Sequence, residues 1–524
     1  MTLYDRTLAR FSRRELLKIA WMLGASAAAP PLATRRLLAM PFFDAYPFTL
    51  GVASGDPLPD GVVLWTRLAP KPLDGGGMPP VVVGVEWEVA RDPRFGSIAQ
   101  KGIALAHPEL AHSVHVEVSG LESGRDYWYR FRAGSEISRV GRTRTAPPTG
   151  APVDRIRFAV CGCNHYEQGY FTAFRRMAEE QFDFVFHTGD YIYEGRPEPG
   201  RSDRVRLHLG QELFTLVDYR NRYALYKSDP DLLAAHASAP WVVSWDDHEV
   251  SNNWSDSKDL SGDARYSEKN VPLLVARGAR AFLEYAPMRP FDVRESQRVY
   301  RKYSYGPLLE LFVLDMRSYR GPNSANLQTT PGADTAFLGR EQLDWLKAGL
   351  NKSRAVWKVI AADMPLGLNV GDGMTPQGQA RWEAVANGEP GAAKGRELEF
   401  AELLSYLKRR QVHNVVWLTA DVHYCAAHFY DPSKAAFRDF DPFWEFVAGP
   451  LNAGTFGPNV LDGTFGPQAV FIKAPAPGLS NLSPLSGMQF FGEVNVQAHS
   501  ADLTVDLRDI NGTSVFSRRL QPRS

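Results

Sequence analysis

The chain has 524 residues, of which 44% are hydrophobic, 12% aromatic and 23% charged. This composition is typical of a globular protein of two or three domains and excludes a disordered, collagen-like or coiled-coil chain. The 59 lysines and arginines equal the 59 aspartates and glutamates, so nucleic-acid binding through bulk positive charge is excluded. Three cysteines, Cys161, Cys163 and Cys425, are too few for a disulfide framework.

Residues 1–29 have the pattern of an export signal. Basic residues gather before Ile19, and the apolar stretch from Ile19 to Ala29 ends in small residues. That stretch is too short to cross a bilayer, which needs about 20 apolar residues. Residues 12–18, SRRELLK, resemble the twin-arginine motif, an address read by an export machinery. The alternative is an ordinary signal, or an amphipathic helix, with a chance arginine pair.

The resemblance to a twin-arginine signal implies export of a folded protein. We therefore expect the twin-arginine export machinery as a partner and a periplasmic or secreted location. Outside the signal no run reaches 18 apolar residues, so we expect no stable membrane insertion.

Residues 47–146 are predicted to form a β-sandwich with a structural role. Apolar and polar residues alternate in 83–89, 114–119 and 127–132, which predicts half-buried antiparallel strands. Residues 121–129, LESGRDYWY, resemble the turn and tyrosine corner of fibronectin-III-like modules. Residues 146–152, APPTGAP, are a linker by composition.

The region 153–520 has a different pattern, and we predict an α/β (α+β) domain there. Helical spacing occurs near Phe171 and Leu343, Gly449 to Gly487 predicts long loops, and Glu493 to Leu520 predicts a closing β segment. Continuous apolar runs predict strands that are covered on both faces. These runs lie at 156–160, 184–186, 241–243, 311–314, 357–360 and 415–418.

Side chains that bind metals follow four of these runs directly. The four segments are 161–165 (CGCNH), 187–193 (HTGDYIY), 244–249 (SWDDHE) and 419–423 (TADVH), and two more runs end at Asp315 and Asp363. Since ligand groups collect at the carboxyl ends of the strands of an α/β sheet, we expect these side chains to converge. Converging carboxylates repel one another, so a cation is the natural partner.

The residue types discriminate between metals. Carboxylate, phenolate and thiolate together favour ferric iron, whereas carboxylate with amide or carbonyl oxygen favours calcium, magnesium or manganese. A cysteine-rich zinc site would need more cysteine or histidine at short spacing.

Three motifs in chain order resemble the blocks of calcineurin-like metallophosphoesterases: Gly189-Asp190-x-x-Tyr193, Asp247-His248-Glu249 and Asp421-x-His423. The Asp-x-x-Tyr pairing is similar to that of purple acid phosphatases. The match is closer to the alkaline phosphatase D (PhoD)-like family, which the chain resembles over nearly its whole length after the signal. The further segments that carry this resemblance are 51–57 (GVASGDP), 64–67 (LWTR), 164–171 (NHYEQGYF), 245–250 (WDDHEV) and 314–320 (LDMRSYR).

This resemblance implies a fold and an activity. The implied fold is an N-terminal fibronectin-III-like β-sandwich followed by a metallophosphoesterase β-sandwich core flanked by helices. The implied activity is that of an exported metal-dependent phosphoesterase, an alkaline phosphatase or phosphodiesterase. Its substrate would be a phosphate ester, either a phosphomonoester or a phosphodiester, which a metal-activated hydroxide would hydrolyse.

The resemblance also implies roles for individual residues. Fe3+ would be held by Cys163, Asp190, Tyr193 and His423. Ca2+ would be held by Asp190, Asp247 and Asp421, with Asn252 or Asn253 close behind. His248 would meet the substrate and donate a proton to the leaving oxygen. Arg317 or Arg320 would offer a fork to the phosphate, with Asn253 beside it.

The chain departs from the superfamily pattern at three places. Cys161-Gly162-Cys163 stands where Asp-x-His is usual, and Asp247 stands where asparagine is usual. Where a further histidine ligand is expected, the nearest candidate is Asp363. These differences favour an oxygen-rich, calcium-like second site.

Structural interpretations of the same residues stay open at this point. Cys163 taken alone is a small buried apolar residue, and Tyr193 taken alone is a packing residue with Tyr191 as a rival. Asp315 and Arg317 form an ion pair that fixes a loop in the alternative interpretation, and Asp363 is favoured as a turn or cap residue. The nearby histidines are expected in the core or behind the ligands: His165, His187, His413 and His428.

Two other functions remain as alternatives. One is a non-catalytic envelope-binding protein with a degenerate metallophosphoesterase fold. The other is metal-assisted hydrolysis of an ester that carries no phosphate.

Overall fold

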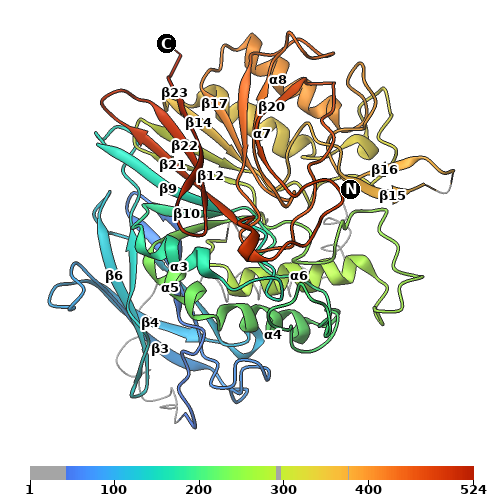
Figure 1. The fold of residues 1–524 in the computed structure, drawn as a ribbon. Helices are drawn as coiled ribbons and strands as arrows, with labels where there is room; N and C mark the ends of the chain where they lie inside the picture. The colour runs from blue at the N-terminus through green and yellow to red at the C-terminus, as the bar shows by residue number, and fades with distance from the viewer. Residues whose placement is uncertain (1–42, 291–296, 376, 524) are drawn as a thin grey trace.

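The computed structural model describes residues 43–290, 297–375 and 377–523, and the predicted signal at 1–29 lies outside them. Two large β-sheets are stacked face to face, helices cover their outer faces, and a smaller sheet, which contains β3, β4 and β6 and is coloured blue, packs at the lower left (Figure 1). This arrangement confirms the predicted fold class, a mixed α/β fold rich in β-sandwiches. No helix in the described ranges is both long and apolar enough to cross a membrane.

The first large sheet has nine strands in the order β23-β22-β21-β9-β10-β11-β1-β2-β5. Its four central strands, from β9 to β1, run parallel. Their bounds are β1 Val52–Leu58, β2 Gly61–Arg67, β5 Ser113–Val118, β9 Arg155–Cys161, β10 Phe184–His187, β11 Pro240–Val243, β21 Phe490–Gln497, β22 Leu503–Asp509 and β23 Ser514–Leu520.

The second large sheet has seven strands in the order β12-β13-β14-β17-β19-β18-β20. The strands β13, β14, β17 and β19 run parallel. The bounds are β12 Arg301–Tyr305, β13 Leu309–Val313, β14 Trp357–Ala361, β17 Val415–Thr419, β18 Cys425–Tyr430, β19 Phe443–Val447 and β20 Pro467–Lys473. A hairpin of β15 Gly371–Met374 and β16 Ala380–Trp382 stands apart.

The main core lies between the two large sheets. Phe158 and Phe184 of the first sheet, which stack at 4.4 Å between ring centroids, share this core with Val359 of the second. The outer face of the first sheet packs against α3 Thr172–Glu179, α4 Leu216–Lys227, α5 Pro230–Ser238 and α6 Val271–Tyr285. The outer face of the second packs against α7 Arg340–Lys352 and α8 Glu397–Arg409. Burial on both faces explains the continuous apolar runs in the sequence.

The N-terminal sandwich shares a sheet with the region that follows the linker. A five-stranded sheet of β3 Val83–Ala90, β4 Ile98–Ala106, β6 Asp126–Ala133, β7 Glu136–Ile137 and β8 Gly141–Arg144 packs against β1, β2 and β5. Because β1 pairs in parallel with β11, the second layer of the sandwich continues the nine-stranded sheet. Gly55 of β1 lies at this junction, where a Cβ would come within 2.3 Å of the Pro287 carbonyl oxygen.

Some elements escaped the sequence patterns. The strand β1 has the sequence VASGDPL, which neither alternates nor forms a continuous apolar run. The edge strand β20 lies inside the segment predicted as long loops, where only a short Val-Phe-Ile run marks it. Three short 3-10 helices complete the described chain: η3 Pro108–Leu110, η4 Ala333–Thr335 and η5 Pro484–Ser486.

Candidate active site

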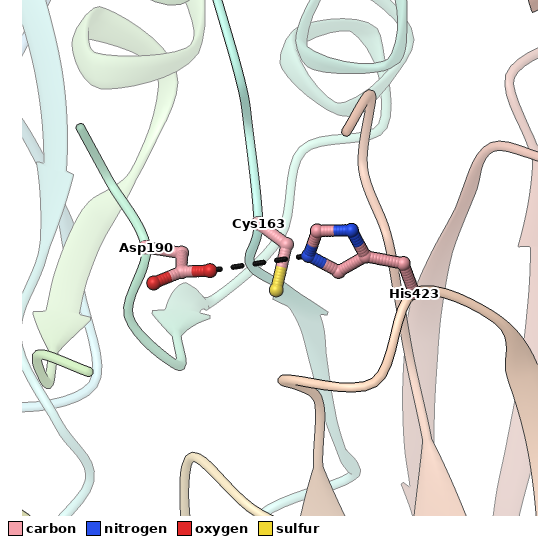
Figure 2. A group of neighbouring side chains, drawn as sticks. All are labelled: Cys163, Asp190 and His423. Atoms are coloured by element: carbon pink, nitrogen blue, oxygen red, sulfur yellow. Dashed lines mark ion pairs between the residues drawn. The ribbon is translucent and has the colours of Figure 1, made fainter. Parts of the chain in front are cut away.

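Four side chains predicted as iron ligands meet where three strands end. Cys163, Asp190 and His423 follow β9, β10 and β17 and point toward one another (Figure 2), with their ligand atoms all within 4.8 Å of each other. The Tyr193 hydroxyl donates to Asp190 Oδ2 at 2.7 Å and lies 3.2 Å from His423 Nε2. His423 Nδ1 is 2.6 Å from the Gly454 carbonyl oxygen, which orients Nε2 toward the cluster. We call these four residues the Cys163 cluster.

The backbone at this cluster is unusual. Cys163, Asp190 and Asp421 have φ angles of +57°, +55° and +60°, in the left-handed region that side chains other than glycine rarely adopt. Such conformations persist where the surrounding structure fixes them, and they gather at functional sites. Gly189 permits the turn before Asp190, because a Cβ there would lie 2.5 Å from the Asp246 nitrogen. Cys163 and Asp190 thereby contribute to the same group of ligand atoms, and Asp421 Oδ1 lies 3.6 Å from Arg317.

A second group of ligand atoms adjoins the first. Asp190, Asp247 and His248 offer atoms within 4.8 Å of one another, so Asp190 belongs to both groups. The Asn253 backbone N–H donates to Asp247 Oδ2 at 2.5 Å, and its side-chain amide donates to Asp372 Oδ1 at 3.1 Å. The Asn252 residue is exposed, and its backbone N–H donates to Glu194. Of the two candidate asparagines, Asn253 therefore lies beside Asp247.

His248 is held in one orientation on the wall of this site. Its Nδ1 lies 2.6 Å from Glu194 Oε2, its Nε2 lies 4.0 Å from Asp247 Oδ1, and its ring packs on Tyr193 at 4.1 Å between centroids. Burial alone would lower the pKa of His248, but Asp247, Glu194 and Asp190 raise it well above its usual value. The imidazolium form is therefore favoured, as a proton donor requires.

Glu194 is a site residue that sequence reasoning missed. It is buried, and its two oxygens accept from His248 and from the Asn252 backbone. Its neighbour Tyr193 was identified from the Asp-x-x-Tyr spacing, but nothing local marks the glutamate as a partner of a histidine far along the chain.

Arg317 and Arg320 do not lie where a phosphate fork was predicted. Arg317 is 1% exposed and Arg320 is 3% exposed. The Arg317 guanidinium binds Asp246 at 2.6 Å and also pairs with Glu383. These arginines follow β13 and lie behind the carboxylates, so neither presents its fork to a substrate in this structure.

The predicted Asp315–Arg317 pairing is partly present. Asp315 Oδ1 accepts from the Arg317 backbone N–H at 3.0 Å and also from the Ser318 backbone N–H. Asp315 thus fixes the loop, as the structural interpretation expected. Asp363 is not a cap: it is buried, and neither of its oxygens has a hydrogen-bond partner among the described residues.

The site concentrates buried negative charge. Burial and neighbouring carboxylates raise the pKa of Asp421 well above its usual value, and burial raises the pKa of Asp363 to about 6. Burial, with Asp190 next, also raises the pKa of the Cys163 thiol and of the Tyr193 hydroxyl far above their usual values. All four groups would lose their protons more readily beside a cation, so the donor set fits bound metal ions.

Another cluster also has ligand-like geometry. His165, Glu167 and His208, which we call the His165 cluster, place three ligand atoms within 4.8 Å of one another. Arg204 lies 3.2 Å from Glu167, and Arg222 lies 3.2 Å from His208 Nδ1. The His165 cluster shares with Tyr193 and His248 the wall of a cavity of about 350 Å³.

Of the other histidines expected in the core or behind the ligands, His187 and His428 are buried, whereas His413 is partly exposed and lies in neither place. His187 lies 2.7 Å from Asn164 Oδ1, His428 lies 3.1 Å from Glu445, and His413 lies 3.6 Å from Asp441. Cys161 and Cys425 are buried free thiols.

Comparisons with known proteins agree with this fold. Residues 158–507 match the family model for PhoD-like phosphatase, and residues 36–147 match that for the PhoD-like phosphatase N-terminal domain. Over 470 residues the chain is 41% identical to alkaline phosphatase D of Bacillus subtilis (strain 168), covering 85% of this chain and 77% of that protein. The solved structure of PhoD superposes with a TM-score of 0.73 at 35% identity, covering 92% of this chain and 94% of that one.

These matches define the class of protein as a phosphatase, a hydrolase that acts on phosphate esters. The chain belongs to the PhoD-like phosphatase family. The family that the sequence motifs indicated is thereby confirmed.

Proposed function

We propose that this protein is an exported, metal-dependent phosphoesterase that hydrolyses phosphomonoesters, phosphodiesters or both. The main support for the proposal is that Asp190 belongs to two groups of ligand atoms. This residue joins the Cys163 cluster to a second, carboxylate-rich group, and His248 stands beside both. The identity to alkaline phosphatase D supports the same reaction class.

The donor set supports two different cations. Cys163, Asp190, Tyr193 and His423 would hold Fe3+, since thiolate, carboxylate, phenolate and imidazole suit a highly charged ion. Asp190, Asp247 and Asp421 would hold Ca2+ with Asn253, because these are oxygen donors. When bound, such metals supply a low-pKa water and neutralise phosphate charge.

Side chains of the protein would assist departure of the leaving group. His248 would donate a proton from Nε2 to the leaving oxygen, because its Nδ1 is engaged by Glu194. Glu194 would keep the ring in that orientation and favour its charged form. Burial of Cys163 and Tyr193, at 1% and 4% exposure, excludes bulk water from the inner side of the site.

The proposal includes export by the twin-arginine machinery to the periplasm or the outside of the cell. The support is the sequence of residues 12–18, SRRELLK, ahead of a short apolar stretch. Replacing Arg13 and Arg14 by lysine in the full-length chain should abolish export. The measurement is the distribution of the protein between cytoplasmic and exported fractions.

Metal analysis together with kinetics on one monoester and one diester tests the enzymatic proposal. We expect iron and calcium in the purified protein, visible absorption from tyrosinate on iron, and hydrolysis that chelators abolish. A colourless, metal-loaded protein that contains only zinc would refute the iron assignment. A protein that carries its metals yet releases neither phosphate nor alcohol from either ester would support the non-catalytic binding alternative.

A further inference from the structure

Arg317 lies at the centre of carboxylates from several parts of the chain. Its Nε donates to Asp246 Oδ1 at 2.6 Å and lies 3.4 Å from Asp363 Oδ2. Its Nη1 binds Glu383, and its Nη2 lies 3.6 Å from Asp421 Oδ1. These carboxylates follow β11, β14, β16 and β17, so one guanidinium links the ends of strands from both large sheets.

The contacts of Arg317 divide the acidic side chains of the site into two sets. The inner set, Asp246, Asp363 and Glu383, pairs with the guanidinium. Asp190 and Asp247, the outer set, have no ion pair with it and instead form the second group of ligand atoms with His248. Asp421 shares a property with each set, because it is a proposed metal ligand and also lies 3.6 Å from Arg317.

The chemistry of arginine suits this internal position. A guanidinium carries five N–H donors in a rigid plane and keeps its charge throughout the working pH range, so it can bind several carboxylates in fixed directions. A lysine ammonium keeps the charge but lacks that fork. Arg317 is fully enclosed by protein, and a phosphate would have to displace a carboxylate to reach it.

We propose that Arg317 is a positioning residue: an internal cation that fixes Asp421 and the Asp246–Asp247 turn for a divalent metal and does not contact the phosphate. This inference rests on the proposed function in one respect: it takes the Ca2+ ligands proposed there as given. Fixing Asp246 also fixes the backbone of its neighbour Asp247, whose carboxylate then faces Asp190. The positive charge of the guanidinium offsets the negative charge of the inner set. The negative charge of the outer set is then offset by the bound cations.

The test is Ca2+ binding, measured by calorimetric titration into iron-loaded protein that has been dialysed free of calcium. Arg317→Lys keeps the charge, and therefore its repulsion of Ca2+, but loses the fork. We expect its dissociation constant for Ca2+ to rise by about tenfold to a hundredfold, the range for residues that orient metal ligands. Iron content and visible absorption should stay at the wild-type level, as should KM at saturating Ca2+.

A second variant tests the guanidinium itself. Arg317→Ala should have a dissociation constant for Ca2+ that differs from the wild-type value. Added guanidinium ion should return it to the wild-type value, whereas the same concentration of sodium ion should not. The matched control is Arg320→Lys, a buried arginine of the same loop that binds Asn323 and the Glu383 carbonyl. Its affinity for Ca2+ should not change. Should Arg317→Ala fail to fold, Arg317→Lys decides the question.

Two outcomes would overturn the inference. One is wild-type Ca2+ affinity in Arg317→Lys together with a raised KM and weaker inhibition by inorganic phosphate, which would assign the residue to phosphate binding. The other is wild-type behaviour of Arg317→Lys in every measurement. If the wild-type protein hydrolyses no ester but Arg317→Lys still weakens Ca2+ binding, the proposed function fails and this inference stands.

Discussion

The Cys163 cluster and the His165 cluster are close neighbours that offer similar ligand atoms. In each, three ligand atoms lie within 4.8 Å of one another, and the His165 and Tyr193 rings that link them are 4.4 Å apart between centroids. The Cys163 cluster has the acidic side chains of Asp247 and Asp421 as neighbours. The His165 cluster has the basic side chains of Arg204 and Arg222 as neighbours. The nitrogens of His208 are already engaged, by the Gly195 carbonyl and the Tyr226 hydroxyl.

The surrounding charge therefore distinguishes a cation site from a structural cluster. Burial and nearby cations lower the pKa values of His165 and His208 well below normal, which keeps both rings neutral. The only acid of the His165 cluster, Glu167, is paired with an arginine. A cation entering there would meet positive charge, so ligand geometry alone is not sufficient to identify a metal site.

The largest effect is expected from breaking the Cys163 cluster. Asp190→Asn removes the carboxylate that both groups share, so metal content should fall and kcat should drop by about a thousandfold or more. Cys163→Ala should lose iron and the visible absorption. Elemental analysis alongside kinetics measures both effects, and an Asp190→Asn protein with full metal content and activity would contradict the assignment.

The next effect concerns His248, on the wall that the two clusters share. His248→Ala should lower kcat by about a hundredfold to ten-thousandfold for esters of alkyl alcohols, because these leaving groups need a proton. Esters of nitrophenol leave readily as anions and should be affected much less. His413→Ala, at a remote histidine paired with Asp441, is the control. Equal losses on both ester types would argue against a role in protonation.

Metal removal should affect stability in a pH-dependent way. The raised pKa values of Asp363 and Asp421 mean that the metal-free native state binds more protons than the unfolded state at pH values just above the usual pKa of a carboxyl group. Its free energy of unfolding must then fall as pH rises. A chelator should lower the thermal unfolding midpoint strongly at about pH 8 and only weakly at about pH 5. Equal shifts at the two values would contradict this sign.

The smallest effect is expected in the His165 cluster. His208→Ala removes the hydrogen bonds of its ring with the Gly195 carbonyl and the Tyr226 hydroxyl, at a cost of about 1 kcal/mol in the free energy of unfolding. Arg222 still donates to the Gly195 carbonyl, and two backbone N–H groups still donate to the Tyr226 hydroxyl. Iron and calcium content should not change. Chemical denaturation and elemental analysis measure the two quantities, and loss of a bound metal from this variant would remove the distinction between the clusters.

Much of the site could be predicted because ligands follow strand ends. Cys163, Asp190, Asp247 and His423 each come directly after an apolar run, and parallel strands bring such positions to one edge. The partners of Arg317 could not be predicted, since its motif, LDMRSYR, is compatible with both phosphate binding and internal ion pairs. Likewise, no local pattern reports that β1 joins β11, because parallel pairing between distant segments depends on tertiary packing.

The shared nine-stranded sheet has a consequence for the order of folding. Ser54 of β1 pairs with Pro240, and Val160 of β9 pairs with Gly492 near the end of the chain. Contacts this distant in sequence form slowly, because a long loop must close before they add stability. The strand that leads to Cys163 therefore acquires its neighbour β21 only after more than 300 further residues have been synthesised. A nascent chain that stops before β21 would hold every proposed metal ligand but lack the strand that pairs with β9.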